Sequence, residues 1–219
     1  MARPLDHLLK ELETMLLKMG EKVEVSIHKA MKSFEKSDLL LAQEVIREDV
    51  DIDEMEEKID DTVIRLIATQ QPVATDLRKI LTAMNIASDL ERMADLAVDI
   101  AEEAMEAERH DKNSKLIHFS LILTMGQMTQ QMVHDGLNSY IDGNTDFAKM
   151  LSRRDDQIDD YYEQIIRQMG DYLGNKSPYA EEARKVCFVA RFLERIADHA
   201  TNIAESVVYM ETGKRMDLN

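Results

Sequence analysis

The sequence has few of the residues that interrupt or cross-link a chain. Among its 219 residues are three prolines, seven glycines, one cysteine and no tryptophan. The single cysteine, Cys187, excludes an intrachain disulfide and indicates a reducing compartment. Because glycine and proline both destabilise a helix interior, their scarcity favours long helices.

Long hydrophobic runs and clusters of positive charge are also missing. No stretch approaches the roughly 20 apolar residues that span a bilayer, and the segment Met1–Asp6 carries no apolar signal. The formal net charge of -16 argues against binding to nucleic-acid phosphates or to anionic lipid. It is compatible with bound cations or with a basic protein partner. We expect a cytoplasmic protein that meets the inner face of a membrane only through protein partners.

The most informative pattern is an internal repeat. The segment Ala87–Glu102 returns as Ala190–Glu205 with ten of sixteen positions identical. The identical positions include charged pairs: Glu91/Glu194, Arg92/Arg195, Asp95/Asp198 and Glu102/Glu205. Upstream the repeat continues at an offset of 106 residues, for example in Met19-Gly20 and Met125-Gly126. Packing alone does not require the same carboxylates, so the repeat indicates a site present in two copies.

Breaks within each half predict three helices. Ser37-Asp38 and the stretch Asp142–Thr145 can each cap a following helix, and Pro72 marks another start. We expect Ser177 to cap a last helix whose first residue is Pro178. This gives six helices of roughly 28–35 residues, or about 40–50 Å each. Short connections make neighbours antiparallel, so the fold class is all-α, with two tandem antiparallel three-helix bundles over residues 1–109 and 110–219.

A helical wheel places acidic side chains on one face of the last helix of each half. In the first copy Glu91, Asp95 and Asp99 share this face, opposite an apolar one. The second copy has Glu194 and Asp198, with Asn202 in place of Asp99 and His199 in place of Leu96. The middle helices carry pairs one turn apart: Asp49/Asp53 and Asp155/Asp159.

Two interpretations of these acids remain open. One acidic stripe is what any solvated helix face can carry. Four pairs, on adjacent helices in both copies, favour a cation site with oxygen ligands, such as Mg²⁺, Mn²⁺, Ca²⁺ or iron. The acids face away from the apolar side, so we expect any metal to lie on an exposed face of the bundle. The absence of Glu-x-x-His weighs against a ferritin-like di-iron oxidase.

The sequence resembles the PhoU family of phosphate-uptake regulators over essentially its whole length. The resemblance is carried by Gln70–Arg78, Leu90–Asp95 and Leu193–His199, and Met19-Gly20 and Val45–Asp49 also fit. It implies two three-helix bundles side by side and surface metal clusters of iron or zinc. In this chain the implied ligands are Asp49/Asp53 with Glu91/Asp95, and Asp155/Asp159 with Glu194/Asp198. Asp99 extends the first set by one turn, while Asn202 weakens the second.

The resemblance further implies a regulatory adaptor and not an enzyme. Such a protein restrains the phosphate-starvation response by connecting the ATPase subunit of the phosphate ABC transporter to a membrane sensor histidine kinase. Long bundles with a few exposed apolar residues often dimerise, so we expect a homodimer. Two alternatives stay open: a hydrolase that uses metal-bound carboxylates, and a helical scaffold whose acids only confer solubility. The sequence offers no separate general base for a hydrolase.

Overall fold

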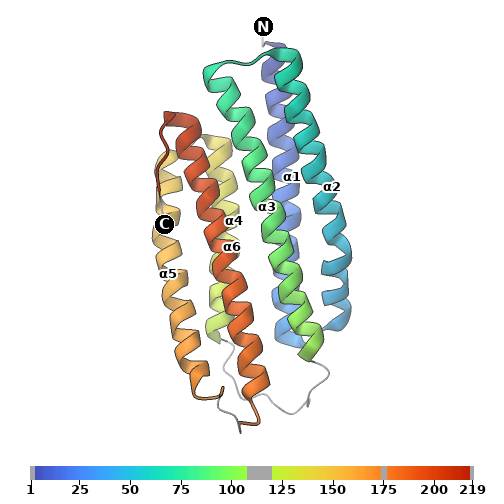
Figure 1. Cartoon of the computed structure of the whole chain (residues 1–219), viewed down its shortest axis with the longest axis vertical. Coiled ribbons are helices and arrows are strands. Elements are labelled where there is room, and N and C mark those ends of the chain that lie inside the picture. The colour runs from blue at the N-terminus through green and yellow to red at the C-terminus, as the bar shows by residue number, and fades with distance from the viewer. Residues whose placement is uncertain (1–2, 108–119, 174–176, 218–219) are drawn as a thin grey trace.

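The structure is a computed structural model that describes residues 3–107, 120–173 and 177–217. Within these ranges the chain forms six helices and no strand, as Figure 1 shows. They are α1 (Pro4–Lys36), α2 (Leu39–Gln70), α3 (Ala74–Ala107), α4 (Ser120–Asp142), α5 (Thr145–Gly170) and α6 (Ala180–Thr212). The all-α prediction is confirmed. The predicted boundary at residues 109/110 and its linker lie outside the described residues. None of the described helices is long and apolar enough to cross a membrane.

The turn between the first two helices is built identically in both halves. Asp38 accepts the Leu41 backbone N–H at 3.1 Å, and the repeat-equivalent Asn144 accepts that of Phe147 at 3.0 Å. Each cap satisfies a backbone donor that the helix itself cannot. The residue before each cap has a positive φ, 53° at Ser37 and 60° at Gly143. Both breaks predicted from the sequence therefore form the expected caps.

The predicted boundaries around the last helix are wrong by a few residues. α5 ends at Gly170 and is 26 residues long, shorter than expected. α6 begins at Ala180 and not at Pro178. The Ser177 hydroxyl accepts the Tyr179 backbone N–H at 3.2 Å in a turn that precedes the helix. Ser177 is thus used in a local turn of the kind short hydroxyl side chains favour, and does not cap the helix.

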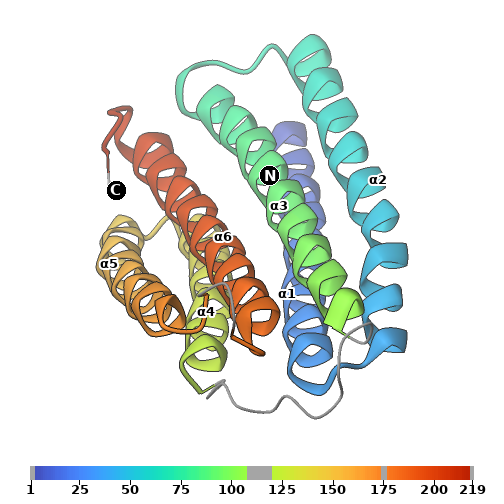
Figure 2. The same ribbon diagram turned by 60° about the horizontal axis from the view of Figure 1, so that its bottom comes forward.

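The two bundles lie side by side, and four helices form the contact between them. In Figure 1 α5, α6, α3 and α2 follow one another across the view, and α1 and α4 lie behind them; Figure 2 shows the same arrangement from a second side. Across the halves α3 contacts α6 and α1 contacts α4. The buried side chains of both halves form one continuous hydrophobic cluster. The repeats therefore share a core and do not pack as two independent ones.

Glycines allow α1 and α4 to approach each other closely. A Cβ on Gly20 of α1 would overlap the Leu137 side chain of α4. A Cβ on Gly126 of α4 would lie 2.9 Å from the Met31 Cε atom of α1. Gly20 and Gly126 are repeat equivalents, and so are Met31 and Leu137. The contact therefore has approximate two-fold symmetry, and the glycine pair seen in the sequence serves packing between the bundles.

Polar contacts fix the register of the antiparallel helices α3 and α6. Near the middle, His199 Nδ1 lies 3.0 Å from Asp89 Oδ1, which also accepts a hydrogen bond of 3.3 Å from Asn202. At one end the Arg78 guanidinium donates to the Met210 carbonyl at 3.2 Å. Because Asp89 holds Asn202 across the interface, the residue that replaces Asp99 in the second copy serves the contact between bundles.

Candidate functional site

The predicted acidic residues form two clusters, each between the second and third helices of one half. The first carboxylate cluster consists of Asp49 and Asp53 of α2 with Glu91 and Asp95 of α3. The second carboxylate cluster consists of Asp155 and Asp159 of α5 with Glu194 and Asp198 of α6. In each half the two helices run antiparallel and contact each other, which brings together acids from distant parts of the sequence.

Mutual repulsion and burial both act on the first carboxylate cluster. Burial, together with the nearby charges of Asp53 and Asp95, raises the pKa of Asp49 to about 6. The pKa of Glu91 is also raised, first by burial and then by Asp95. Arg92 opposes this effect, with its guanidinium 3.3 Å from both Glu91 and Asp95. The structure thus brings all four predicted residues into electrostatic contact.

The second carboxylate cluster is more deeply buried. Asp155 is 7% exposed, and burial together with the charges of Asp198 and Asp159 raises its pKa to about 7. The pKa values of Asp159, Glu194 and Asp198 are raised as well, in each case mainly by burial. This copy therefore joins a buried carboxylate, Asp155, to an exposed one, Asp159, at the bundle face where we expect any metal to lie. The neighbouring helix covers one flank of the acidic stripe, which a wheel drawn for a single helix does not show.

Asp99 takes a different position from the other predicted acids. Burial raises its pKa, and the charges of Glu102 and Asp95 add to this, while Arg195 of the second half lowers it. Asp99 is thus placed within the electrostatic reach of both Asp95 and the opposite bundle.

Several residues that sequence reasoning did not single out belong to the same surroundings. Glu56 lies one turn beyond Asp53 on α2, and burial and Asp60 raise its pKa. Asp49, Asp53, Glu56 and Asp60 follow helical spacing, so extending the stripe by two turns would have found them. In the second half Arg191 donates to both oxygens of Glu194 at 2.5 and 2.6 Å. Its repeat equivalent is Ser88, so the repeat comparison gave no signal for this pair.

The donor set fits a hard or borderline cation by its chemistry. Asp49 Oδ1 and Glu91 Oε2 are buried and accept no hydrogen bond. Arg92 lies near Glu91 but is not in hydrogen-bonding geometry to it. Such oxygens, with raised pKa values, gain from a positive charge. In the described residues no three His, Cys, Asp or Glu side chains converge closely enough to hold a metal as they stand. Binding would therefore require side-chain rotation toward a common point.

Comparison with known proteins identifies the family. The PhoU domain model matches twice, over residues 16–104 and 122–207, which confirms the internal duplication. A phosphate-specific transport system accessory protein PhoU homolog of Clostridium acetobutylicum is 39% identical over 96% of this chain and 95% of its own length. The accessory protein PhoU of Escherichia coli is 32% identical over 94% of this chain and 84% of its own length.

Solved structures agree with this result. PhoU from Pseudomonas aeruginosa superimposes with a TM-score of 0.88 at 31% identity, covering 95% of this chain and 99% of that one. The phosphate transport system regulatory protein PhoU from Streptococcus pneumoniae gives 0.89 at 29% identity, covering 97% and 99%. Sequence, duplication and fold agree, and the chain belongs to the PhoU family.

Proposed function

We propose that this chain is a regulatory adaptor of phosphate homeostasis that restrains phosphate uptake and the phosphate-starvation two-component response. The observation that carries the proposal is the similarity along 96% of the chain to a relative named as an accessory protein of phosphate transport. The protein acts by docking and not by turnover. It binds the ATPase subunit of the phosphate ABC transporter, the sensor histidine kinase, or both, in the cytoplasm at the inner face of the membrane. Docking that favours one state of a partner shifts that partner's equilibrium.

In this proposal the two carboxylate clusters bind metal ions. Asp49, Asp53, Glu91 and Asp95 would hold the first, with Asp99 one turn further on. Asp155, Asp159, Glu194 and Asp198 would hold the second. Iron or zinc is favoured by the family resemblance, and the oxygen ligands also suit magnesium, manganese or calcium. A bound cation would offset repulsion between the carboxylates and give an acidic protein a local positive charge for a partner to recognise.

The test uses a host that lacks this gene, carries a starvation-promoter reporter and grows in ample phosphate. We expect the reporter to be on in the deletion strain and off when wild type is restored. A variant with Glu91, Asp95, Glu194 and Asp198 changed to Gln or Asn should leave it on. Circular dichroism and expression level confirm that the variant is folded and present.

A charge-matched control separates the clusters from the overall charge. Glu11, Glu35, Glu57 and Asp142 are exposed acids outside both clusters. Changing these four to Gln or Asn removes the same number of charges and should leave the reporter off. A deletion that changes neither the reporter nor phosphate uptake would contradict the adaptor role. Full function of the cluster variant would favour the scaffold interpretation, in which the acids act only in solvation.

The hydrolase alternative differs from the adaptor because it requires catalytic turnover that depends on a bound metal. It predicts a phosphatase-type or esterase-type activity that is lost on chelation and restored by one specific metal. The adaptor predicts no activity in either state. Screening the purified protein with and without chelator against chromogenic esters distinguishes the two.

We also propose that the protein is a homodimer. Leu40, Ile64 and Val73 are 79%, 63% and 74% exposed, so apolar side chains are available on the outer surface. Light scattering of the purified protein over a concentration series should give twice the mass of one chain. A monomer mass at all concentrations would contradict the proposal.

A further inference from the structure

A groove of about 550 Å³ lies between α1 and α2 of the first half. Its volume falls within the range of roughly 300–1,000 Å³ that is usual for small-molecule sites. None of the acids of the two carboxylate clusters lines it. The lining residues are Lys18, Glu21, Lys22, Val25, Ser26 and Lys29 of α1 with Glu48, Ile52 and Met55 of α2.

Hydrogen-bond donors line the α1 side of the groove in one row. Lys18, Lys22 and Ser26 are spaced four residues apart, which places them on one face of the helix. Ser26 is 5% exposed, and its hydroxyl has no hydrogen-bond partner. A buried hydroxyl without a partner is unfavourable, and a ligand oxygen that accepts from Ser26 after a small side-chain shift would relieve this cost. Among the described residues Lys18 is in no ion pair, and its ammonium is available to the same ligand.

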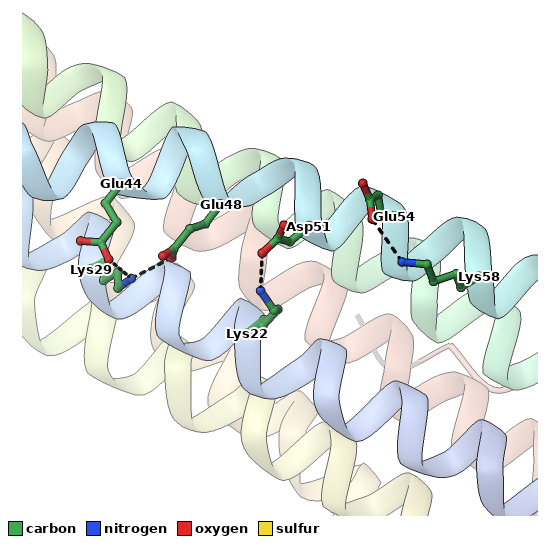
Figure 3. A network of polar contacts seen from close by, with 7 residues as sticks. All are labelled: Lys22, Lys29, Glu44, Glu48, Asp51, Glu54 and Lys58. Atoms are coloured by element: carbon green, nitrogen blue, oxygen red, sulfur yellow. Dashed lines mark hydrogen bonds and ion pairs between the residues drawn. The ribbon is translucent and has the colours of Figure 1, made fainter.

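The ion pairs across the groove leave one end open to an anion. Figure 3 shows Lys29 held by two carboxylates, Glu44 at 2.8 Å and Glu48 at 2.7 Å, and Lys22 held only by Asp51 at 2.7 Å. The Lys22 and Asp51 side chains are 45% and 59% exposed, and exposed ion pairs contribute little to stability. Lys22 can therefore exchange Asp51 for a ligand at small cost.

Apolar side chains face this row of donors. Ile52 is 2% exposed and forms the floor, Met55 is half-buried, and Val25 is 50% exposed on the α1 side. Two carboxylates also line the groove. Glu48 is bound to Lys29, and Glu21 lies between Lys18 and Lys22 in the sequence. These negative charges repel any anion, so a ligand must place its charge against Lys18 and Lys22 and not against Glu21 or Glu48.

The second half has lost these features at equivalent positions. Its counterparts of Lys18, Lys22, Ser26 and Lys29 are Thr124, Met128, Met132 and Asp135. Met132 is fully buried, so the second half carries a long apolar side chain where the first half carries the short Ser26. Lys22 and Lys29 also form ion pairs between the helices, but Lys18 forms no described ion pair and the Ser26 hydroxyl has no partner, and the second half has Thr124 and Met132 at these two positions. The comparison within the chain therefore points to a ligand site in the first half.

We propose that this groove binds a small organic phosphate ester. The dianionic phosphoryl group lies against the ammonium groups of Lys18 and Lys22 and accepts the hydrogen bond of the Ser26 hydroxyl. The organic part lies on Val25, Ile52 and Met55. Two ammonium groups and a hydroxyl match the charge and the three terminal oxygens of a phosphoryl group better than a carboxylate. This site goes beyond the adaptor role and does not depend on it.

Isothermal titration of the purified full chain, with chelator present, tests the proposal. The probes are phenyl phosphate, inorganic phosphate and phenol. We expect saturable binding of one phenyl phosphate per chain. Inorganic phosphate should bind roughly tenfold more weakly because it makes no use of the apolar floor, and phenol should not bind measurably. In spectra of methyl-labelled methionine, the Met55 signal should shift and the Met128 signal should not.

Variants assign the binding to the groove. Lys22→Ala should weaken phenyl phosphate binding by roughly tenfold. Ser26→Met, which copies the second half, should abolish it. Asp51→Asn releases Lys22 and should strengthen binding several-fold. The matched control is Lys58→Ala on α2, since Lys58 pairs with Glu54 at 3.1 Å outside the groove (Figure 3) and its loss should change nothing.

Three results would overturn the proposal. The first is no saturable binding of phenyl phosphate to wild type. The second is equal binding to wild type and to Lys22→Ala, which, unlike Ser26→Met, alters an exposed side chain and should fold normally. The third is inorganic phosphate binding as tightly as the ester, because the apolar floor would then have no role.

Discussion

The ion pair between the first two helices has opposite polarity in the two halves. In the first half Lys29 of α1 pairs with Glu48 of α2 at 2.7 Å. At the repeat-equivalent positions Asp135 of α4 pairs with Arg154 of α5. The position thus accepts either sign as long as the two charges differ. We predict that Asp135→Lys combined with Arg154→Glu, which copies the first half, folds with most of the wild-type stability.

The magnitude follows from burial. The Asp135 side chain is 8% exposed, and without Arg154 it keeps one described hydrogen bond, from Gln131 at 2.9 Å. Removing one partner of a buried pair costs about 3–5 kcal/mol, so with this remaining contact we expect a loss of about 2–3 kcal/mol for Arg154→Met. Lys29 still has Glu44 at 2.8 Å when Glu48→Gln removes its other partner. That change should cost about 0–1 kcal/mol.

Urea unfolding followed by circular dichroism measures these effects. The single variants Asp135→Lys and Arg154→Glu each place like charges together and should be strongly destabilised. The double variant should recover about 2 kcal/mol or more of their summed loss. The control is the exposed pair Glu163 and Arg167, with side chains 66% and 69% exposed, where the same exchange should show a coupling of about 0.3–0.5 kcal/mol. A coupling at Asp135 and Arg154 no larger than in this control would refute the reasoning.

Three further predictions concern the clusters and the contact between the bundles. In the folded protein the pKa of Asp155 is raised to about 7 from 3.8. The part of the free energy of unfolding that this shift contributes is therefore fully present below about pH 4 and is lost as pH rises through 7. Metal-free Asp155→Asn should therefore exceed wild type in stability by about 2–4 kcal/mol at pH 8 and by little at pH 4, and an equal gain at both pH values would contradict this. Asp89→Ala removes the acceptor of His199 and Asn202 and should cost about 1–2 kcal/mol in urea unfolding, whereas an unchanged midpoint would mean that the contact does not form. If both clusters bind metal, Glu91→Gln with Asp95→Asn should remove only the first cluster's share of iron or zinc, as measured by elemental analysis of loaded protein; loss of all metal would mean that the clusters do not bind independently.

Local patterns predicted the elements well and singled out the acidic residues, while the pairing of the acids across two helices was implied by the family resemblance. Helix caps depend on short-range chemistry, so the equivalent turns at Asp38 and Asn144 could be found from residue type and spacing. Helical spacing combined with the repeat gave the acidic pair on each helix. Glu56 could have been found in the same way, by extending the helical spacing of the acids along α2. The start of α6 was missed because Ser177 and Pro178 also suit an ordinary turn, and residue type does not decide between the two.

The packing of the halves against each other could not be predicted in the same way. Asp89 and His199 lie far apart in the sequence, and neither has a charged repeat equivalent, since these are Phe192 and Leu96. Periodicity shows that a helix has an apolar face but does not say which other helix covers it. The burial of Asp155 has the same origin, because it depends on how α5 and α6 cover each other's flanks.

Differences between the copies bear on the proposed metal sites. The acidic stripe of the first cluster continues into Glu56 and Asp60, where the second half has Tyr162 and Ile166. In the second cluster Arg191 already neutralises Glu194, and burial gives Asp155 the higher pKa. A cation there must displace an arginine and, near neutral pH, a proton as well. We therefore expect the first cluster to bind metal more tightly, which agrees with the loss of the Asp99 carboxylate at Asn202. A titration in which Asp155→Asn removes the tighter of two metal-binding steps would contradict this order.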